Sequence, residues 1–202
     1  MAASDSFDFL TDQSTLWAVV LGALLATIGG FVATALERWL DRRERERNAA
    51  LFFGEVLVTL QTILGFAENT KKVGDPYGPI TMRMLQSLRR EIDIYDRNRE
   101  SLFALRDAEL RARIQTLVIR MTIPLDNIIE GAPEIAGLKV LLKTIAPDDR
   151  EELEARIAEF ERRRELSFEF LQDTVAQLKP AIVLLEPLAR QSFDRIDAIA
   201  RS

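Results

Sequence analysis

The sequence predicts an all-α protein in which one N-terminal transmembrane helix continues into a cytoplasmic antiparallel bundle of about four helices. Three observations support this prediction. Residues 13–36 contain no Asp, Glu, Lys or Arg, arginines cluster directly after them, and apolar residues recur every three or four positions through most of the remaining chain. No stretch alternates apolar and polar residues for long enough to predict a sheet.

The apolar segment 15–36 is predicted to cross a membrane. As an α-helix it would be about 33 Å long at ~1.5 Å per residue, which is enough for a hydrocarbon core of about 30 Å. The tryptophans Trp17 and Trp39 stand at its two ends, where indole rings favour the membrane interfaces. Two alternatives stay open. A buried core helix is rarely apolar on all sides over this length, and a cleaved signal peptide, which Ala33-Thr34-Ala35 would suit, needs a basic start and a shorter apolar run.

The charges on either side of the span predict its orientation. No Lys or Arg precedes it, whereas a run of arginines follows at once, namely Arg38, Arg42, Arg43, Arg45 and Arg47. The positive-inside rule therefore predicts residues 1–14 as a short external tail and everything from Glu37 onward as cytoplasmic. In a bacterial cell, this orientation predicts a single-pass protein of the inner membrane.

Small residues recur along one line of the predicted span. They are Ala18, Gly22, Ala26, Gly30 and Thr34. Helices in lipid have little hydrophobic reason to associate, so small side chains that let backbones approach closely favour their packing. We therefore expect this small-residue stripe to contact a second copy of the chain or another membrane protein. A second register, Gly22/Ala26/Gly29/Ala33, has the 4-3-4 spacing of a left-handed crossing, so the handedness stays open.

Residues 37–72 are predicted to continue the helix beyond the membrane. Their charges are mixed, which favours a solvated helix over a lipid-specific basic patch. The expected ion pairs are Asp41–Arg45, Arg43–Glu46 and Glu44–Arg47. An apolar stripe from Phe53 to Ala67 then faces the bundle, and the Gly- and Pro-rich segment 74–79 ends the helix near Lys72.

Residues 80–202 are predicted to supply the other helices of the bundle. The second helix follows Pro79 and carries Leu85, Leu88, Ile92 and Tyr95 on one side. The third begins near Leu105, is kinked by Pro124 and ends before Gly131-Ala132-Pro133, and a short apolar piece follows at 138–145. The last helix begins at a cap on Asp148 or Asp149 and has a seam from Leu153 to Leu188, which Pro180 and Pro187 kink or divide.

The stretch 94–110, IYDRNRESLFALRDAEL, invites one comparison. It carries Tyr95, Asp96, Asn98, Leu102, Leu105, Glu109 and Leu110. It resembles a segment of uncharacterised bacterial single-pass membrane proteins with a helical cytoplasmic domain. The resemblance implies the same architecture and a bacterial source, and it implies no activity. From the residues alone, Asp96 and Asn98 are turn or capping residues, and Tyr95 is a core aromatic with a polar tip.

Composition argues against several classes of function. The chain has no Cys and no His, which excludes thiol nucleophiles, disulfides, Cys/His zinc sites, imidazole bases and histidine-ligated haem. With 27 Lys and Arg against 32 Asp and Glu, the net charge of −5 disfavours nucleic-acid binding. Neither a calcium-binding loop nor a phosphate-binding glycine loop occurs. We therefore expect no catalytic residue, metal site, cofactor or small-molecule substrate.

A few charged residues interrupt apolar runs. We expect Glu55 on the solvated face of its helix, and the same interpretation is preferred for Arg120 and Glu186, with a buried Arg120–carboxylate pair as the alternative. The run 162–164 of three arginines is flanked by glutamates and is expected to form a salt-bridged helix face, with contact to a phosphate or an acidic partner as the alternative.

These predictions favour a non-enzymatic, membrane-anchored scaffold that self-associates through the small-residue stripe and binds partners through its cytoplasmic bundle. The alternative is an accessory or regulatory subunit of a channel, transporter or secretion complex, in which the stripe packs against the partner's helices. A transducer of external signals is less favoured, because an external tail of 14 residues is too short for a ligand-binding domain.

Overall fold

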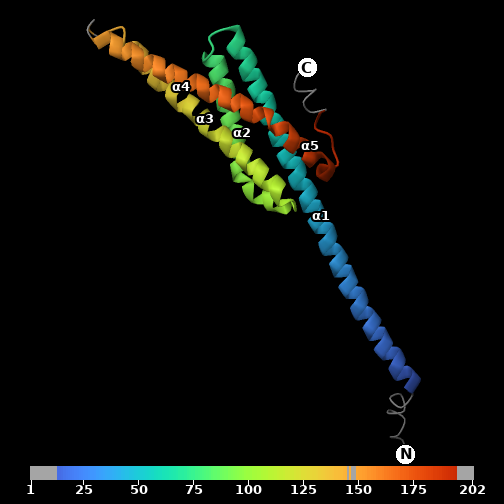
Figure 1. Cartoon of the computed structure of the whole chain (residues 1–202). Coiled ribbons are helices and arrows are strands. Elements are labelled where there is room, and N and C mark those ends of the chain that lie inside the picture. The colour runs from blue at the N-terminus through green and yellow to red at the C-terminus, as the bar shows by residue number, and fades with distance from the viewer. Residues whose placement is uncertain (1–12, 145, 147–148, 195–202) are drawn as a thin grey trace, which may run out of the picture. The chain divides into compact units, whose positions relative to one another are not determined.

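The computed structural model describes residues 13–144, 146 and 149–194, and every regular element among them is a helix. The order is α1 (Gln13–Val73), α2 (Pro79–Arg97), the 3-10 helix η2 (Arg99–Ala104), α3 (Ala108–Leu141), α4 (Arg150–Ala176) and α5 (Leu178–Ala189), as Figure 1 shows. The all-α prediction is therefore confirmed. Most of the expected external tail lies outside the described residues.

The chain divides into two compact units, one up to Arg45 and one from Glu46 onward. The first contains the N-terminal part of α1, and α1 is the one described helix long and apolar enough to cross a membrane by length and composition. All of its residues from Trp17 to Arg45 are exposed. The boundary between the units falls within the segment 37–72 and not at its beginning.

In the second unit, α1 contributes an apolar stripe to the core, as the helical spacing predicts. The helix ends at Val73, where Gly74 and Pro76 break the pattern. The turn that follows is held locally, because the Asp75 carbonyl accepts the Gly78 N–H at 3.0 Å and the Asp75 carboxylate accepts the Tyr77 N–H at 3.1 Å. Pro79 then opens α2 at a position where a missing N–H costs nothing.

One hydrophobic core joins the elements of the second unit. On α2 the buried apolar residues are those predicted: Leu85, Leu88, Ile92 and Tyr95. They pack in the same cluster as Phe53, Leu57, Leu60 and Leu64 of α1 and as Ile114, Met121, Leu125 and Ile128 of α3. Burying such side chains stabilises the fold by roughly 1.5–3 kcal/mol each.

The prediction for the third helix is wrong at both ends. Leu105 precedes α3 and follows η2, and α3 continues through Pro124 and Pro133 to Leu141. Residues 138–141 of the predicted apolar piece therefore belong to the same helix, and residues 142–144 form the turn after it. Each proline removes one backbone hydrogen bond, but α3 packs along α4 on both sides of Pro133. Tertiary packing outweighs the local stop signal here.

The α3–α4 pair has a second, smaller apolar cluster near its connecting turn. Ile135, Leu153 and Ile157 are buried but lie outside the main core. Ion pairs cross between the same two helices, Lys139 with Glu161 at 2.7 Å and Arg156 with Glu134 at 3.7 Å. At the start of α4, Asp149 holds the cap position without a side-chain capping bond, and Asp148 lies outside the described residues.

The predicted division of the last helix occurs at Gln177, between α4 and α5. Pro180 explains the position, because its ring clashes with the carbonyl four residues earlier, and that residue, Ala176, is the last of α4. Pro187 lies inside α5 without ending it. The seam residues Leu153, Leu171, Leu178 and Leu185 are buried, as predicted.

A contact from the C-terminal segment closes the core. After α5, Arg190 takes a left-handed conformation (φ 55°), which turns the chain back toward α1. The Phe193 ring is then buried against Gly54, where a Cβ atom would lie only 2.0 Å from a ring carbon. The Glu186 carboxylate accepts the Phe193 N–H at 2.8 Å and the Ser192 hydroxyl at 3.0 Å, which fixes this turn.

Candidate functional site

The small-residue stripe lies on a part of α1 that no other described segment covers. Ala18, Gly22, Ala26, Gly30 and Thr34 are all exposed, and a Cβ atom added at Gly22 or Gly30 would meet nothing within 4 Å. The hydroxyls of Thr27 and Thr34 donate to the carbonyls of Ala23 and Gly30 at 2.8 and 2.9 Å. The hydroxyls of Thr27 and Thr34 are therefore satisfied within their own helix, and the surface around them is apolar.

The stripe includes a shallow hollow. Gly30, Thr34 and Ala35 line a depression of about 220 Å³ together with Phe31 and Arg38. Phe31 is 80% exposed beside it. When two membrane helices pack closely, a large side chain of one helix can fill a hollow left by small side chains of the other.

The two tryptophans that are predicted to lie at the membrane–water interfaces are exposed, one at each end of the span. Trp17 is 59% exposed and Trp39 is 46% exposed. The guanidinium of Arg43 lies 5.2 Å from the centre of the Trp39 ring, a cation–π contact. All five arginines that predict the orientation, Arg38, Arg42, Arg43, Arg45 and Arg47, are exposed.

The expected ion pairs of this segment are not those that form. Among the described residues, no ion pair joins Asp41 to Arg45, Arg43 to Glu46 or Glu44 to Arg47, the three pairs that helical spacing suggests. Glu46 binds Arg106 instead, at 3.4 Å through the side chain, and it accepts the Arg106 backbone N–H at 3.1 Å. Arg106 offers Glu46 both a positive charge and a backbone N–H, whereas Arg43, its expected partner on the same helix, would offer only a charge.

A second polar cluster joins the turn after α1 to α4. Glu165 accepts the Tyr77 hydroxyl at 2.8 Å and pairs with Lys71. Arg164 lies 3.8 Å from the centre of the Tyr77 ring, and Lys71 lies 4.1 Å from the centre of the Phe168 ring. The cluster therefore attaches the turn to α4 through two cation–π contacts and through the Glu165 carboxylate, which binds both Lys71 and Tyr77.

Glu165 and Tyr77 have shifted pKa values for identifiable reasons. Burial acts to raise the pKa of Glu165, but the hydrogen bonds from Lys71 and Tyr77 outweigh it and lower the pKa below its ordinary value. Burial, followed by the hydrogen bond to Glu165, raises the pKa of Tyr77. Both shifts keep Glu165 ionised and Tyr77 protonated at neutral pH, the states that this hydrogen bond requires.

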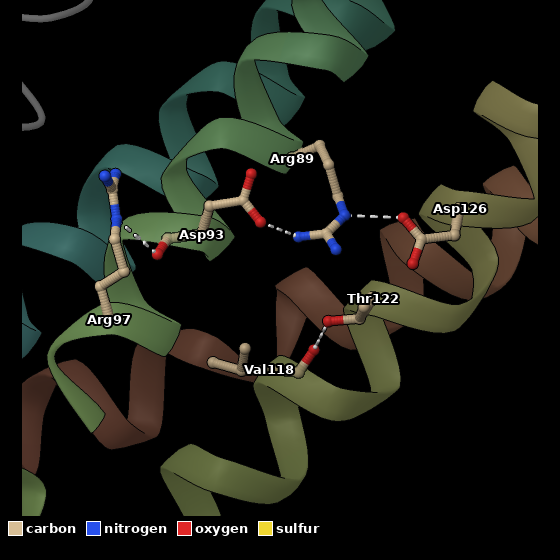
Figure 2. Close-up of polar contacts among 6 residues, drawn as sticks. All are labelled: Arg89, Asp93, Arg97, Val118, Thr122 and Asp126. Carbon is tan, nitrogen blue, oxygen red and sulfur yellow. Dashed lines mark hydrogen bonds and ion pairs between the residues drawn. The ribbon is translucent and has the colours of Figure 1, made fainter. Parts of the chain in front are cut away.

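Arg89 links α2 to α3, as Figure 2 shows. Its Nε donates to Asp126 at 2.7 Å, and its Nη1 pairs with Asp93 one turn further along α2. Arg97 donates to the carbonyl of Asp93, and Thr122 donates to the carbonyl of Val118, so the neighbouring turns are also satisfied internally. This network joins α2 to α3 through one guanidinium group that contacts a carboxylate on each helix.

The isolated charged residues mostly have structural roles. Glu55 is exposed, as expected. Arg120 forms no buried pair with a carboxylate in the part of the chain that the structure describes. It donates to the Gln177 side chain at 3.1 Å and lies 5.2 Å from the centre of the Phe170 ring. Glu186 holds the turn before Phe193.

The three consecutive arginines 162–164 do not all make the same kind of contact. Arg162 and Arg163 both pair with Glu159, at 3.0 and 2.6 Å, which confirms a salt-bridged face for these two. Arg164 differs, because it stacks on Tyr77 and its Nε is buried without an acceptor among the described residues.

In the 94–110 stretch the predictions for Asn98 and Tyr95 are confirmed, whereas Asp96 lies inside α2 and is not a turn or capping residue. Asn98 ends α2, and its side chain donates to the Ile94 carbonyl at 2.8 Å. Tyr95 is buried edge-on against Phe53, with ring centres 5.8 Å apart. Burial raises the pKa of Tyr95 to about 12, and its hydroxyl has no partner among the described residues.

Comparison with protein-family profiles, curated proteins and solved structures finds no match for this chain. Within the described residues, no group of three or more acidic side chains is placed to hold a metal ion. The sequence pattern gives no signal for the Gly54–Phe193 contact or for the Tyr77–Glu165 pair, because each joins residues far apart in the chain.

Proposed function

We propose that this chain is a non-enzymatic, single-pass membrane scaffold whose N-terminal helix anchors a cytoplasmic helical bundle. One observation supports this most strongly: the apolar part of α1 is long enough to span a bilayer, and none of it is buried by the described protein. Exposing so much contiguous apolar surface to water is unfavourable, whereas lipid accommodates it. The arginines that follow it support an orientation with the bundle in the cytoplasm, at the inner membrane of a bacterial cell.

Self-association through the small-residue stripe is the second part of the proposal. The stripe is exposed, its glycines have open space above them, and the hydroxyl of its one threonine, Thr34, donates within the helix. A second copy placed there gains close backbone contact without leaving any polar group unpaired. The bundle surface then serves to bind further proteins.

The test is replacement of Gly22 and Gly30 by Ile in the full chain, followed by a membrane two-hybrid measurement of self-association. We expect the signal to fall, because both side chains would hold the two backbones apart. The matched control replaces Leu24 and Val32, which lie two residues further along and therefore on the opposite side of the helix, by Ile. An unchanged signal in the glycine variant would contradict self-association through this stripe.

Cross-linking in native membranes, followed by mass spectrometry, separates the scaffold from the alternative. Recovery of the chain alone as a discrete oligomer supports the scaffold. Recovery of a different membrane protein in fixed ratio supports an accessory or regulatory subunit of a channel, transporter or secretion complex.

A further inference from the structure

Phe103 is the most exposed aromatic side chain of the second unit. It is 78% exposed, compared with 43% for Phe66 and 44% for Phe170. It lies on η2, between α2 and α3. Single exposed apolar side chains are common on protein surfaces, and Phe103 is distinguished by how little of its ring the described protein covers.

Phe103 lies on a corner of the bundle that comprises η2 and residues 105–106, and buried side chains and hydrogen bonds hold this corner in place. Leu102 and Leu105 on either side of it are buried in the core. The Leu105 N–H donates to the Leu102 carbonyl at 3.1 Å, and Arg111 donates to the carbonyls of Leu105 and Arg106. Because both neighbours point inward and the turn is closed by hydrogen bonds, the Phe103 ring is held outward.

This corner is attached to the start of the second unit. Arg106 binds Glu46 through its side chain and its backbone N–H, and Glu46 is the first residue of that unit. Glu46 follows Trp39, the predicted inner interface residue, by seven positions. Seven residues span about 10 Å as a helix and at most about 25 Å when fully extended. The covalent chain therefore keeps Glu46, to which the corner is attached, within that length of Trp39.

The surroundings of Phe103 suit a bilayer interface. Arg97 and Arg99 are exposed beside it, and long arginine stems can lie on apolar surface while the guanidinium reaches lipid phosphates. Asp96 and Glu100 are exposed there too, so the local charge is nearly balanced. Apolar burial of the ring, more than attraction to anionic lipid, is therefore the driving force.

We propose that the corner comprising η2 and residues 105–106 rests on the inner leaflet, with the Phe103 ring inserted between lipid headgroups. This inference rests on the proposed function, since it requires residues 15–36 to span the bilayer. The contact would hold the bundle against the membrane and restrict its orientation, so that one side of it faces the cytoplasm for partners.

The absence of cysteine allows a direct test with single-cysteine variants of the full chain in liposomes. An environment-sensitive fluorophore is attached at Ser101→Cys, next to the intact Phe103, and quenching by lipids with a nitroxide near the headgroup is measured. Asn69→Cys, an exposed position on α1 far from Glu46 along the helix, is the matched control. Leu25→Cys, with deeper nitroxide quenchers, reports on the span itself.

We expect the label at residue 101 to lose fluorescence to the quenching lipid and the label at residue 69 to keep it. Adding Phe103→Asp should restore the fluorescence at residue 101, with helicity unchanged because the replaced side chain is exposed. Quenching at residue 25 without quenching at residue 101 would overturn the inference and leave the proposed anchor standing. An unquenched label at residue 25 would overturn the anchor. A blue-shifted but unquenched label at residue 101 would mean that a protein, not lipid, covers the corner.

Discussion

At the scale of single residues, the bundle depends on the contact between Gly54, which has no side chain, and the large Phe193 ring. Gly54 allows the Phe193 ring to lie against the α1 backbone, and the buried ring fills the space. Glycine weakens a helix interior by roughly 0.5–1 kcal/mol relative to alanine. Its presence in the middle of α1 is explained by the closeness of the ring.

We expect Gly54→Ala to destabilise the second unit by about 1–3 kcal/mol, because the new methyl group must displace a packed ring. Gly65→Ala is the matched control, since a Cβ atom there meets nothing within 4 Å. It should stabilise the protein by about 0.5–1 kcal/mol through helix propensity. Chemical denaturation monitored by circular dichroism measures both. Equal effects of the two substitutions would show that Phe193 does not occupy this position.

The Glu165 cluster predicts a dependence of stability on pH. The pKa of Glu165 is lowered in the folded protein, so its contribution is fully present above the ordinary glutamate pKa of about 4.3 and is lost as the pH falls through the folded value. Thermal unfolding of the wild type and of Glu165→Gln should therefore differ at neutral pH and converge at acid pH. A difference that persists unchanged at acid pH would mean that the charge of Glu165 is not responsible.

At the scale of helices, local signals and tertiary packing compete, and α3 shows packing prevailing. The apolar periods of α1 and α2 are strong and uninterrupted in the bundle, so their buried faces could be predicted from sequence. Gly131-Ala132-Pro133 is an equally clear stop signal, yet α3 passes through it. Sequence inspection could not weigh that signal, because the contacts with α4 that oppose it come from residues some 20 positions later.

We expect Pro133→Ala to stabilise the second unit by about 1–3 kcal/mol. Pro133 is exposed, so alanine loses no core contact, and it restores an N–H that can donate to the Ile129 carbonyl. The thermal midpoint of the full chain in detergent measures the change. A lower midpoint would indicate that the structure requires a bend at this proline.

At the scale of the whole molecule, the arginines after the span predict which side of the membrane each end occupies. We expect a cysteine introduced at Ser6 to react with a membrane-impermeant maleimide added outside intact cells, and one at Thr144 to react only after lysis. Reaction at both positions in intact cells would contradict the orientation.

The architecture was more accessible from sequence than the candidate sites. The span, the helical class and the break near Pro180 depend on composition and local spacing, which a sequence displays directly. The pairing of Glu46 with Arg106 and the outward position of Phe103 depend on how distant segments meet. Helical spacing instead suggested partners for Glu46 within its own helix.

The position of Phe193 also affects the order in which the protein matures. A ribosome makes Gly54 long before Phe193, so the surface of α1 at Gly54 lacks its ring while the residues between them are being synthesised. The apolar segment 15–36 emerges long before that and can enter the membrane while the bundle is still open. On the proposed function, insertion would therefore precede completion of the core, and a chain released before residue 193 would be anchored with its core incomplete.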